Sequence, residues 1–185
     1  MSIIEITPDV YDVDIGLTYA TNQNFTGKPI YASSHCYLHQ DAAKKLEKAI
    51  ELVKQFDLRI RIFDCLRPTE AQWMLWRHTP DPDFLAHPAN GSPHSRGVAI
   101  DLSLSDKSGK LLNMGTTFDE FTNLSHHGAI NISLEAQRNR FFLLGIMTTA
   151  GWDFYNNEWW HYQLFDARNY PLIHDKDLEK SMMEN

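Results

Sequence analysis

Apolar residues recur at helical spacing in three stretches of the chain. Between Asp41 and Phe56 they return every three or four positions, with lysine and glutamate between them, which is typical of an amphipathic helix. We expect a second helix from Thr69 to about His78, opened by a capping box in its first four residues, Thr-Glu-Ala-Gln. A third is expected over Leu134–Ala150, with Ser133 as its N-cap and Gly151 as its stop.

Alternation of polar and apolar residues predicts strands in three other places. Leu58–Asp64 alternates as a half-buried strand does. Val98–Leu104 places valine, isoleucine and leucine on one face, and alanine, aspartate and serine on the other. An aromatic strand is expected over Trp159–Phe165, and Asp106–Gly109 is expected to turn. The pattern predicts an α+β fold, a single domain over residues 1–185 whose small, mainly antiparallel sheet packs against helices.

The intervening segments have the composition of loops. Up to about Ser34, aspartate, threonine, asparagine, glycine and proline mix with scattered aromatics, so we expect irregular structure with short strands. Asp81–Gly91 is rich in proline. Gly115–Ser133 is long and polar, and loops of that length are commonly functional. The tail from about Asp175 is expected to be frayed.

Composition narrows the classes of function. The 185 residues carry a net charge of −7 and no basic patch, which argues against a nucleic-acid partner. No stretch approaches the roughly 20 apolar residues that span a bilayer, and the start of the chain lacks the pattern of a signal peptide. Cys36 and Cys65 lack the spacing of a disulfide framework or a thiolate metal site. We therefore expect a cytoplasmic protein with no membrane partner; its oligomeric state is left open.

Two short segments, far apart in the chain, carry the candidate chemistry. Ser92–Asp101 supplies His94 and Asp101, and the second segment supplies Glu158 and His161. Two imidazoles, one carboxylate ligand and a spare carboxylate are the inventory of a catalytic zinc site, which has three protein ligands, an open position for water and a general base. If these side chains converge, the predicted sheet carries one Zn²⁺ per chain.

Each segment also has a simpler interpretation. His94 could be a loop histidine and Asp101 a strand-end carboxylate held by backbone amides, and the short motif alone leaves both open. Residues three apart in a flat strand face opposite sides. Glu158 and His161 therefore share a pocket only if Glu158 lies in the turn before the strand, which the two preceding asparagines favour. The alternative is an interfacial tryptophan pair beside a surface glutamate.

Four further residues have side chains capable of chemistry. Arg67 follows a predicted strand and precedes Pro68 and a helix start, a rigid mounting that suits a carboxylate or a developing oxyanion; the alternative is a surface arginine. His126 and His127 are adjacent, and neighbouring residues rarely bind one ion together, so we expect them to be loop groups or to support a ligand. We expect Cys65 to be a buried structural thiol rather than a nucleophile.

These segments resemble the zinc D-alanyl-D-alanine dipeptidases of the VanX type. The resemblance extends over most of the chain. It rests on motifs that occur in order: Tyr19-Ala20-Thr21, Asn24–Pro29, Asp64–Pro68, Ser92–Leu102, Met114-Gly115, Phe118-Asp119, Ser125-His126-His127 and Glu158–Tyr162. Several independent blocks in the right order are far more specific than any one motif.

The resemblance implies the catalytic roles. His94, Asp101 and His161 match the family's zinc ligands. Glu158 matches its catalytic base, and Arg67 matches the arginine that stabilises the transition state. A preference for D-residues is implied by the resemblance alone.

The resemblance also implies how the substrate is bound. Asp119 is similar to the carboxylate that receives the substrate's free ammonium group, Tyr19 matches an aromatic residue near the pocket, and Ser92 is a further candidate for substrate binding. The chain departs from the family in two places. The loop Thr79–Gly91 is short for the family, and no tyrosine within Tyr31–Ser34 aligns with the one that binds the substrate carboxylate.

These observations favour a cytoplasmic zinc dipeptidase that hydrolyses D-alanyl-D-alanine to free D-alanine. One alternative is a D,D-carboxypeptidase or peptidoglycan endopeptidase on the same scaffold, which must admit a long N-terminal chain; Asp119 argues against it. A second is a zinc-stabilised binding module without catalysis, against which Glu158 and Arg67 argue. A third is a structural protein without metal. A role in antibiotic resistance, wall recycling or D-alanine use is not decided by the sequence.

Overall fold

The computed structural model describes residues 2–183, and over this range the main sheet has five strands in the order β2-β4-β5-β7-β6. The β2–β4 pair is parallel, and the other three pairs are antiparallel. The strands are β2 (Asp14–Ile15), β4 (Leu58–Asp64), β5 (Ala99–Asp106), β6 (Asp153–Phe154) and β7 (His161–Gln163). The predicted α+β fold with a mainly antiparallel sheet is therefore confirmed.

The first forty residues are irregular between short elements, as their composition predicts. Strand β1 (Ile3–Glu5) pairs antiparallel with β3 (Tyr37–His39) in a separate two-stranded sheet. Between them lie the short helix α1 (Pro8–Tyr11), strand β2 and a 3-10 turn over Thr18–Ala20. This turn carries Tyr19 into the interior.

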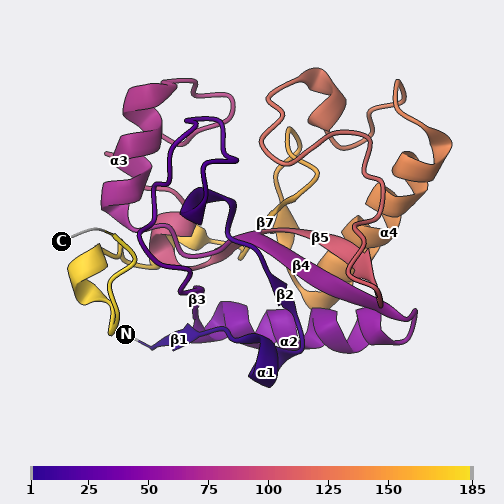
Figure 1. The fold of residues 1–185 in the computed structure, drawn as a ribbon, viewed down its shortest axis with the longest axis horizontal. Coiled ribbons are helices and arrows are strands. Elements are labelled where there is room, and N and C mark those ends of the chain that lie inside the picture. Colours follow the sequence, from indigo (N-terminus) through magenta and orange to yellow (C-terminus); the bar gives the residue numbers. More distant parts are fainter. Residues whose placement is uncertain (1, 184–185) are drawn as a thin grey trace.

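Helices α2 (Gln40–Lys54) and α4 (Leu134–Ala150) pack against each other, and α2 also contacts β4. Figure 1 shows α2 running along one side of the sheet, with α3 (Thr69–His78) on the other. The predicted caps of α4 are present. The Ser133 hydroxyl accepts a hydrogen bond from the Ala136 N–H, and Gly151 ends the helix with a left-handed φ of 96°. Periodicity therefore located these two helices correctly.

Strand β5 is buried on both faces, and this places the site. Its apolar residues, including Ile100 and Leu102, lie in the hydrophobic core. The residues between them are small or polar, and Asp101 and Ser103 are buried as well. A strand presents alternate residues to opposite faces, so one sequence serves both the core and a polar cavity. The buried carboxylate of Asp101 then needs partners close by.

The predicted capping box at the start of α3 is wrong. The side chain of Thr69 donates instead to the carbonyl of Ile173, at 3.0 Å, and the N-cap position belongs to Pro68. The Gln72 side chain accepts a hydrogen bond from Arg67 and donates one to the carbonyl of Ala86. Tertiary partners have displaced the local cap, because both side chains find better partners outside the helix.

Two other boundaries differ from the prediction. The last strand covers His161–Gln163 instead of Trp159–Phe165, because the tryptophan pair lies in the turn that precedes it. The tail is not frayed over residues 175–183. Asp175 accepts hydrogen bonds from Ser181, Met182 and Met183, and the Met182 side chain is buried. The last two residues lie outside the described range.

Candidate metal centre and active site

The three predicted metal ligands converge. The β5–β7 pairing places Asp101 directly opposite His161, and a 3-10 turn over His94–Arg96 brings His94 over them. His94 Nε2 lies 3.1 Å from His161 Nδ1 and 3.3 Å from Asp101 Oδ2. His161 Nδ1 lies 3.1 Å from Asp101 Oδ1. Within residues 2–183, this is the one group of three or more such side chains whose ligand atoms all lie within 4.8 Å of one another.

The turn that carries His94 depends on Gly97. This residue has a φ of 68°, in the left-handed region, where glycine carries no steric penalty. A Cβ there would also lie 3.2 Å from the backbone nitrogen of His39. The carbonyl of His94 accepts a hydrogen bond from the Arg67 N–H, which ties the turn to the end of β4. Gly97 therefore permits a tight bend, and the Arg67 hydrogen bond locks the turn to the sheet.

This group could hold a metal ion, and its geometry fits zinc. In a tetrahedral site with bonds of 2.0–2.1 Å, ligand atoms lie about 3.3 Å apart, and two imidazoles with a carboxylate are a usual donor set. The observed separations are 3.1–3.3 Å. The remaining nitrogen of each ring also has a partner: His94 Nδ1 lies 2.6 Å from the carbonyl of Cys65, and His161 Nε2 lies 3.0 Å from Gln163 Oε1.

Glu158 lies in the turn before β7, as its spacing from His161 requires. The Glu158 carbonyl accepts a hydrogen bond from the His161 N–H, and Oε2 of its side chain lies 3.9 Å from His161 Nδ1. Burial raises the pKa of Glu158 well above its usual range; the Asp101 charge adds to the rise, and Arg67 opposes it. Burial alone would raise the pKa of Asp101 too, but His94 and His161 outweigh it and hold that pKa low. The two carboxyl groups therefore differ in proton affinity.

Arg67 is buried, which excludes the surface alternative. Its Nε and Nη2 donate to Asp64 Oδ2 at 2.9 and 2.8 Å, and Nη1 donates to Gln72 Oε1 at 2.9 Å. Nη2 also lies 3.6 Å from Asp101 Oδ2, and the guanidinium stands 4.9 Å from the centre of the Tyr19 ring. These contacts fix a positive charge beside the three converging ligands.

The other three predicted residues surround this centre. The Tyr19 hydroxyl donates to Asp119 Oδ2 at 2.8 Å, and Asp119 has a left-handed φ of 59°. Burial raises the pKa of Asp119 well above its usual range, although the hydrogen bond from Tyr19 opposes this. Ser92 Oγ accepts a hydrogen bond from the His94 N–H at 3.2 Å. Ser92 therefore also supports the turn that carries His94.

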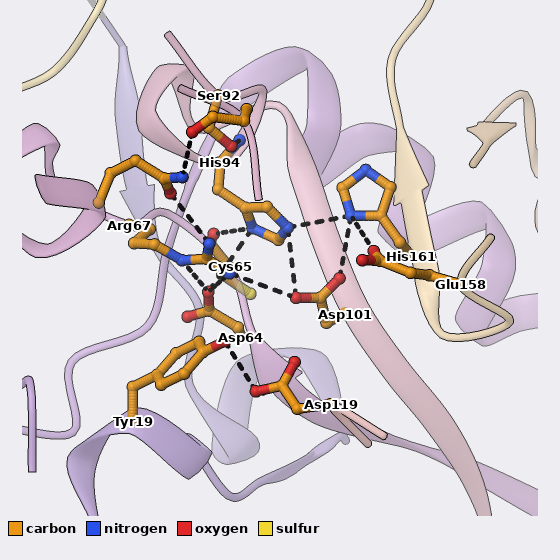
Figure 2. A network of polar contacts seen from close by, with 12 residues as sticks. Tyr19, Asp64, Cys65, Arg67, Ser92, His94, Asp101, Asp119, Glu158 and His161 are labelled. Carbon is orange, nitrogen blue, oxygen red and sulfur yellow. Dashed lines mark hydrogen bonds and ion pairs between the residues drawn. The ribbon is translucent and has the colours of Figure 1, made fainter. Parts of the chain in front are cut away.

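All eight predicted site residues line one cavity of about 230 Å³. Figure 2 shows Arg67, His94, Asp101 and His161 around a common centre, with Asp119 and Tyr19 on one side and Glu158 on another. The proline-rich loop contributes residues 82–86 to the wall. Tyr155 donates its hydroxyl to the carbonyl of Asp83 at 3.0 Å, and Phe84 stacks on Phe121. Pockets for drug-sized ligands have volumes of about 300 Å³ or more, so this smaller cavity suits a small ligand.

Several residues that build the site were not singled out from the sequence. Asp64 holds Arg67 and accepts a hydrogen bond from the Tyr31 hydroxyl. Tyr31 is not among the residues that line the cavity. Gln163 lies behind His161. Arg140, on α4, is buried and donates to the carbonyls of Met114, Leu124 and His126. Asp64 stands between apolar neighbours in the sequence, which was the available signal, whereas Arg140 directly follows polar residues and gave none.

The loop over Gly115–Ser133 supports the turn that carries Glu158. Thr116 Oγ1 accepts hydrogen bonds from Arg140 Nη2 at 3.2 Å and from Trp159 Nε1 at 2.8 Å. The His127 N–H donates to the carbonyl of Asn156 at 2.8 Å. His127 therefore supports the site through its backbone, as a loop residue outside the ligand group. Cys65 and Cys36 are free and buried.

Comparison with known proteins shows the family of the chain. A family profile described as D-ala-D-ala dipeptidase matches residues 3–180. The chain belongs to this family. It is 44% identical to the D-alanyl-D-alanine dipeptidase of Escherichia coli (strain K12) over 89% of this chain and 86% of the relative. It is 35% identical to the D-alanyl-D-alanine dipeptidase of Enterococcus faecium over 85% and 88% of the two chains.

The similarity to solved structures is more distant. One similar structure is that of the vancomycin resistance D,D-pentapeptidase VanY, solved in complex with Zn(II). It matches with a TM-score of 0.44 and 14% identity, over 87% of this chain and 83% of that chain.

Over residues 2–183, no helix has both the length and the apolar character needed to cross a bilayer. The expected dipeptidase family is confirmed by the sequence relatives, and the members of this family are metallopeptidases.

Proposed function

We propose that this chain hydrolyses the D-alanyl-D-alanine dipeptide to free D-alanine, using one zinc ion per chain. The observation that carries the proposal is the convergence of His94, Asp101 and His161 in a small cavity that Glu158 and Arg67 also line. The names of the relatives supply the substrate and its D-configuration. Water adds across the amide bond, so that each dipeptide yields two amino acids.

Two imidazoles and a carboxylate would hold the metal, and a zinc ion bound there would polarise the scissile carbonyl and make water more acidic. Glu158 takes the proton of the attacking water and delivers it to the nitrogen of the departing amine. Its burial supports this role, because a carboxylate with a raised pKa binds a proton more strongly than one in water. Asp101 stays ionised beside it.

Arg67 donates hydrogen bonds to the oxyanion that forms when water adds to the carbonyl. Its guanidinium is held in advance by Asp64 and Gln72, so no reorganisation is needed when the charge develops. Asp119 receives the substrate's ammonium group at the other side of the cavity, where the Tyr19 hydroxyl holds its carboxylate. Ser92 and Tyr19 form part of the wall around the dipeptide.

Asp119 favours a free dipeptide over a longer chain, because a bound ammonium group opposes the burial that raises the pKa of this carboxyl. An acylated N-terminus has no positive charge, so a blocked peptide would bury the Asp119 carboxyl without its partner. The small cavity points the same way. A D,D-carboxypeptidase or endopeptidase must accommodate that longer chain, and a non-catalytic module would have no use for both Glu158 and Arg67.

A substrate comparison tests the proposal. The zinc-loaded protein is given D-alanyl-D-alanine, its N-acetylated form and L-alanyl-L-alanine, and release of alanine is measured. We expect the free D,D-dipeptide to be cleaved, and the acetylated form to be slower by about 100-fold or more. The variant Asp119→Asn should narrow that difference. Cleavage of the blocked substrate alone would assign a carboxypeptidase instead, and preference for the L,L-dipeptide would contradict the proposed specificity.

A further inference from the structure

The two imidazoles at the centre present different nitrogens to it. His94 faces the other ligands with Nε2, and its Nδ1 lies 2.6 Å from the backbone carbonyl of Cys65. His161 faces them with Nδ1, and its Nε2 lies 3.0 Å from Gln163 Oε1. One ring is thus held by the main chain, and the other by a side chain that can be exchanged without altering the backbone.

Gln163 reaches His161 because of its position on β7. The two residues are separated by one position in the strand, so their side chains leave the same face of the sheet. The residue opposite Gln163 on β5 is Ala99, which is buried and small, and leaves room for the glutamine side chain. Gln163 is half-buried and belongs to the wall of the cavity.

A histidine that binds a metal must present a lone pair to it and therefore carries its proton on the other nitrogen. For His161, that places the hydrogen on Nε2, where the oxygen of Gln163 can accept it. Both partners in this centre, the Cys65 carbonyl and the Gln163 amide, are neutral acceptors. The Asp64 carboxylate also lies 3.7 Å from His94 Nδ1. Among the three ligands, Asp101 is the one carboxylate.

We propose that Gln163 is a positioning residue of the metal centre: by accepting a hydrogen bond from His161 Nε2–H, it fixes the tautomer and the orientation in which Nδ1 faces Asp101 and His94. This rests on the proposed zinc-dependent function. Removing the acceptor leaves the ring free to rotate and to carry its proton on Nδ1. The centre then binds the metal more weakly. Losses of 10–100-fold in metal affinity are typical when such a partner is removed.

The experiment measures zinc affinity by competition with a chromogenic chelator, on metal-free protein. Gln163→Leu removes the acceptor at similar size, Gln163→Glu restores one, and Gln55→Leu makes the same change at an exposed position at the end of α2. We expect Gln163→Leu to bind zinc about 10–100-fold more weakly than wild type. Gln163→Glu should bind at least as tightly as wild type, and Gln55→Leu should be unchanged.

A second measurement separates positioning from direct contact with substrate. At zinc concentrations that saturate each variant, Gln163→Leu should keep the KM of the wild type, because its defect lies in holding the metal. Unchanged zinc affinity with a raised KM would make Gln163 a substrate contact and overturn the inference. Equal zinc affinity and equal KM would overturn it as well. If the wild type itself binds no zinc, the proposed function is wrong. That result differs from the two outcomes above, in which the wild type binds zinc and the Gln163→Leu variant binds it equally well.

Discussion

The site is assembled from two segments that the fold holds in different ways. The first segment (residues 92–106) carries His94 and Asp101 and lies against β4 through six paired residues of β5. The second segment (residues 153–163) carries Glu158 and His161 and is a short hairpin, in which β6 and β7 share two residue pairs and β7 pairs with β5 through three. The first segment is held by the longer backbone pairing, whereas the second also depends on hydrogen bonds that join Trp159 and Asn156 to the loop beside it.

This difference separates two requirements of the catalytic centre. The first segment lies against a fixed charge distribution, because Asp64, Arg67 and the Cys65 carbonyl, which contact it, are all anchored at or just after the end of β4. The second supplies the proposed base, whose position depends on the contacts of Trp159 and Asn156 with the loop. Segments with few backbone pairs open at lower free-energy cost than central strands. The second segment is therefore where we expect the site to adjust when substrate enters.

Replacing the proposed base should have the largest effect on rate and little on structure. In Glu158→Gln the side chain keeps its size but cannot accept the proton, so we expect kcat to fall by about 10²–10⁴-fold. Zinc content and the midpoint of thermal unfolding should stay close to wild type, because Glu158 lies beside the ligand group and is not part of it. Steady-state kinetics and metal analysis of the same sample check this.

Glu51→Gln is the matched control for that prediction. Glu51 lies on the exposed side of α2, away from the cavity, and should leave kcat unchanged. An unchanged kcat in Glu158→Gln would remove Glu158 from the mechanism. Loss of zinc together with activity would make it a ligand instead, and the two segments would then share the metal differently from the arrangement described above.

Breaking the anchor of the first segment should mainly affect stability. Asp64→Asn keeps the shape of the side chain but removes the carboxylate hydrogen-bonded to the buried guanidinium of Arg67, which keeps only the more distant Asp101 at 3.6 Å; breaking such a buried pair costs about 3–5 kcal/mol. Urea unfolding of the metal-free protein measures this. Asp57→Asn, which removes the exposed partner of Lys107, should change the free energy of unfolding little. Equal effects of the two substitutions would show that the Asp64–Arg67 pair does not anchor the segment.

The difference in backbone pairing also explains why the first segment is predicted from the sequence better than the second. Helical periodicity and strand alternation are local, so α2, α4, β4 and β5 were found close to their observed bounds. Glu158 and His161 are three positions apart, so they could share a pocket only if Glu158 lay in the turn before the strand, and the structure places it there. The contacts of Gln72, Arg140 and Gln163 join residues across the fold or depend on an unknown tautomer, and no local pattern encodes them. The capping box failed because tertiary partners displaced it.

His127 offers a way to weaken the second segment by pH alone. Burial lowers its pKa from 6.5 to about 4, with the nearby charge of Arg140 adding to the decrease. Its ring packs edge-on against Phe154 of β6, at 5.0 Å between centroids. Among the described residues, its Nε2 has no hydrogen-bond partner. The native state therefore disfavours the protonated ring.

The sign of the pH dependence follows from that shift. Below pH 6.5 the unfolded chain binds a proton at this position, whereas the native protein does not until about pH 4, so the free energy of unfolding falls as the pH is lowered through this range. From pH 7 to pH 5 we expect a loss of about 2 kcal/mol from this residue. His127→Leu should remove this part of the dependence in urea unfolding of the metal-free protein, and exposed His78→Leu should not. If the wild type and His127→Leu lose stability in parallel, the second segment is not held by a neutral histidine.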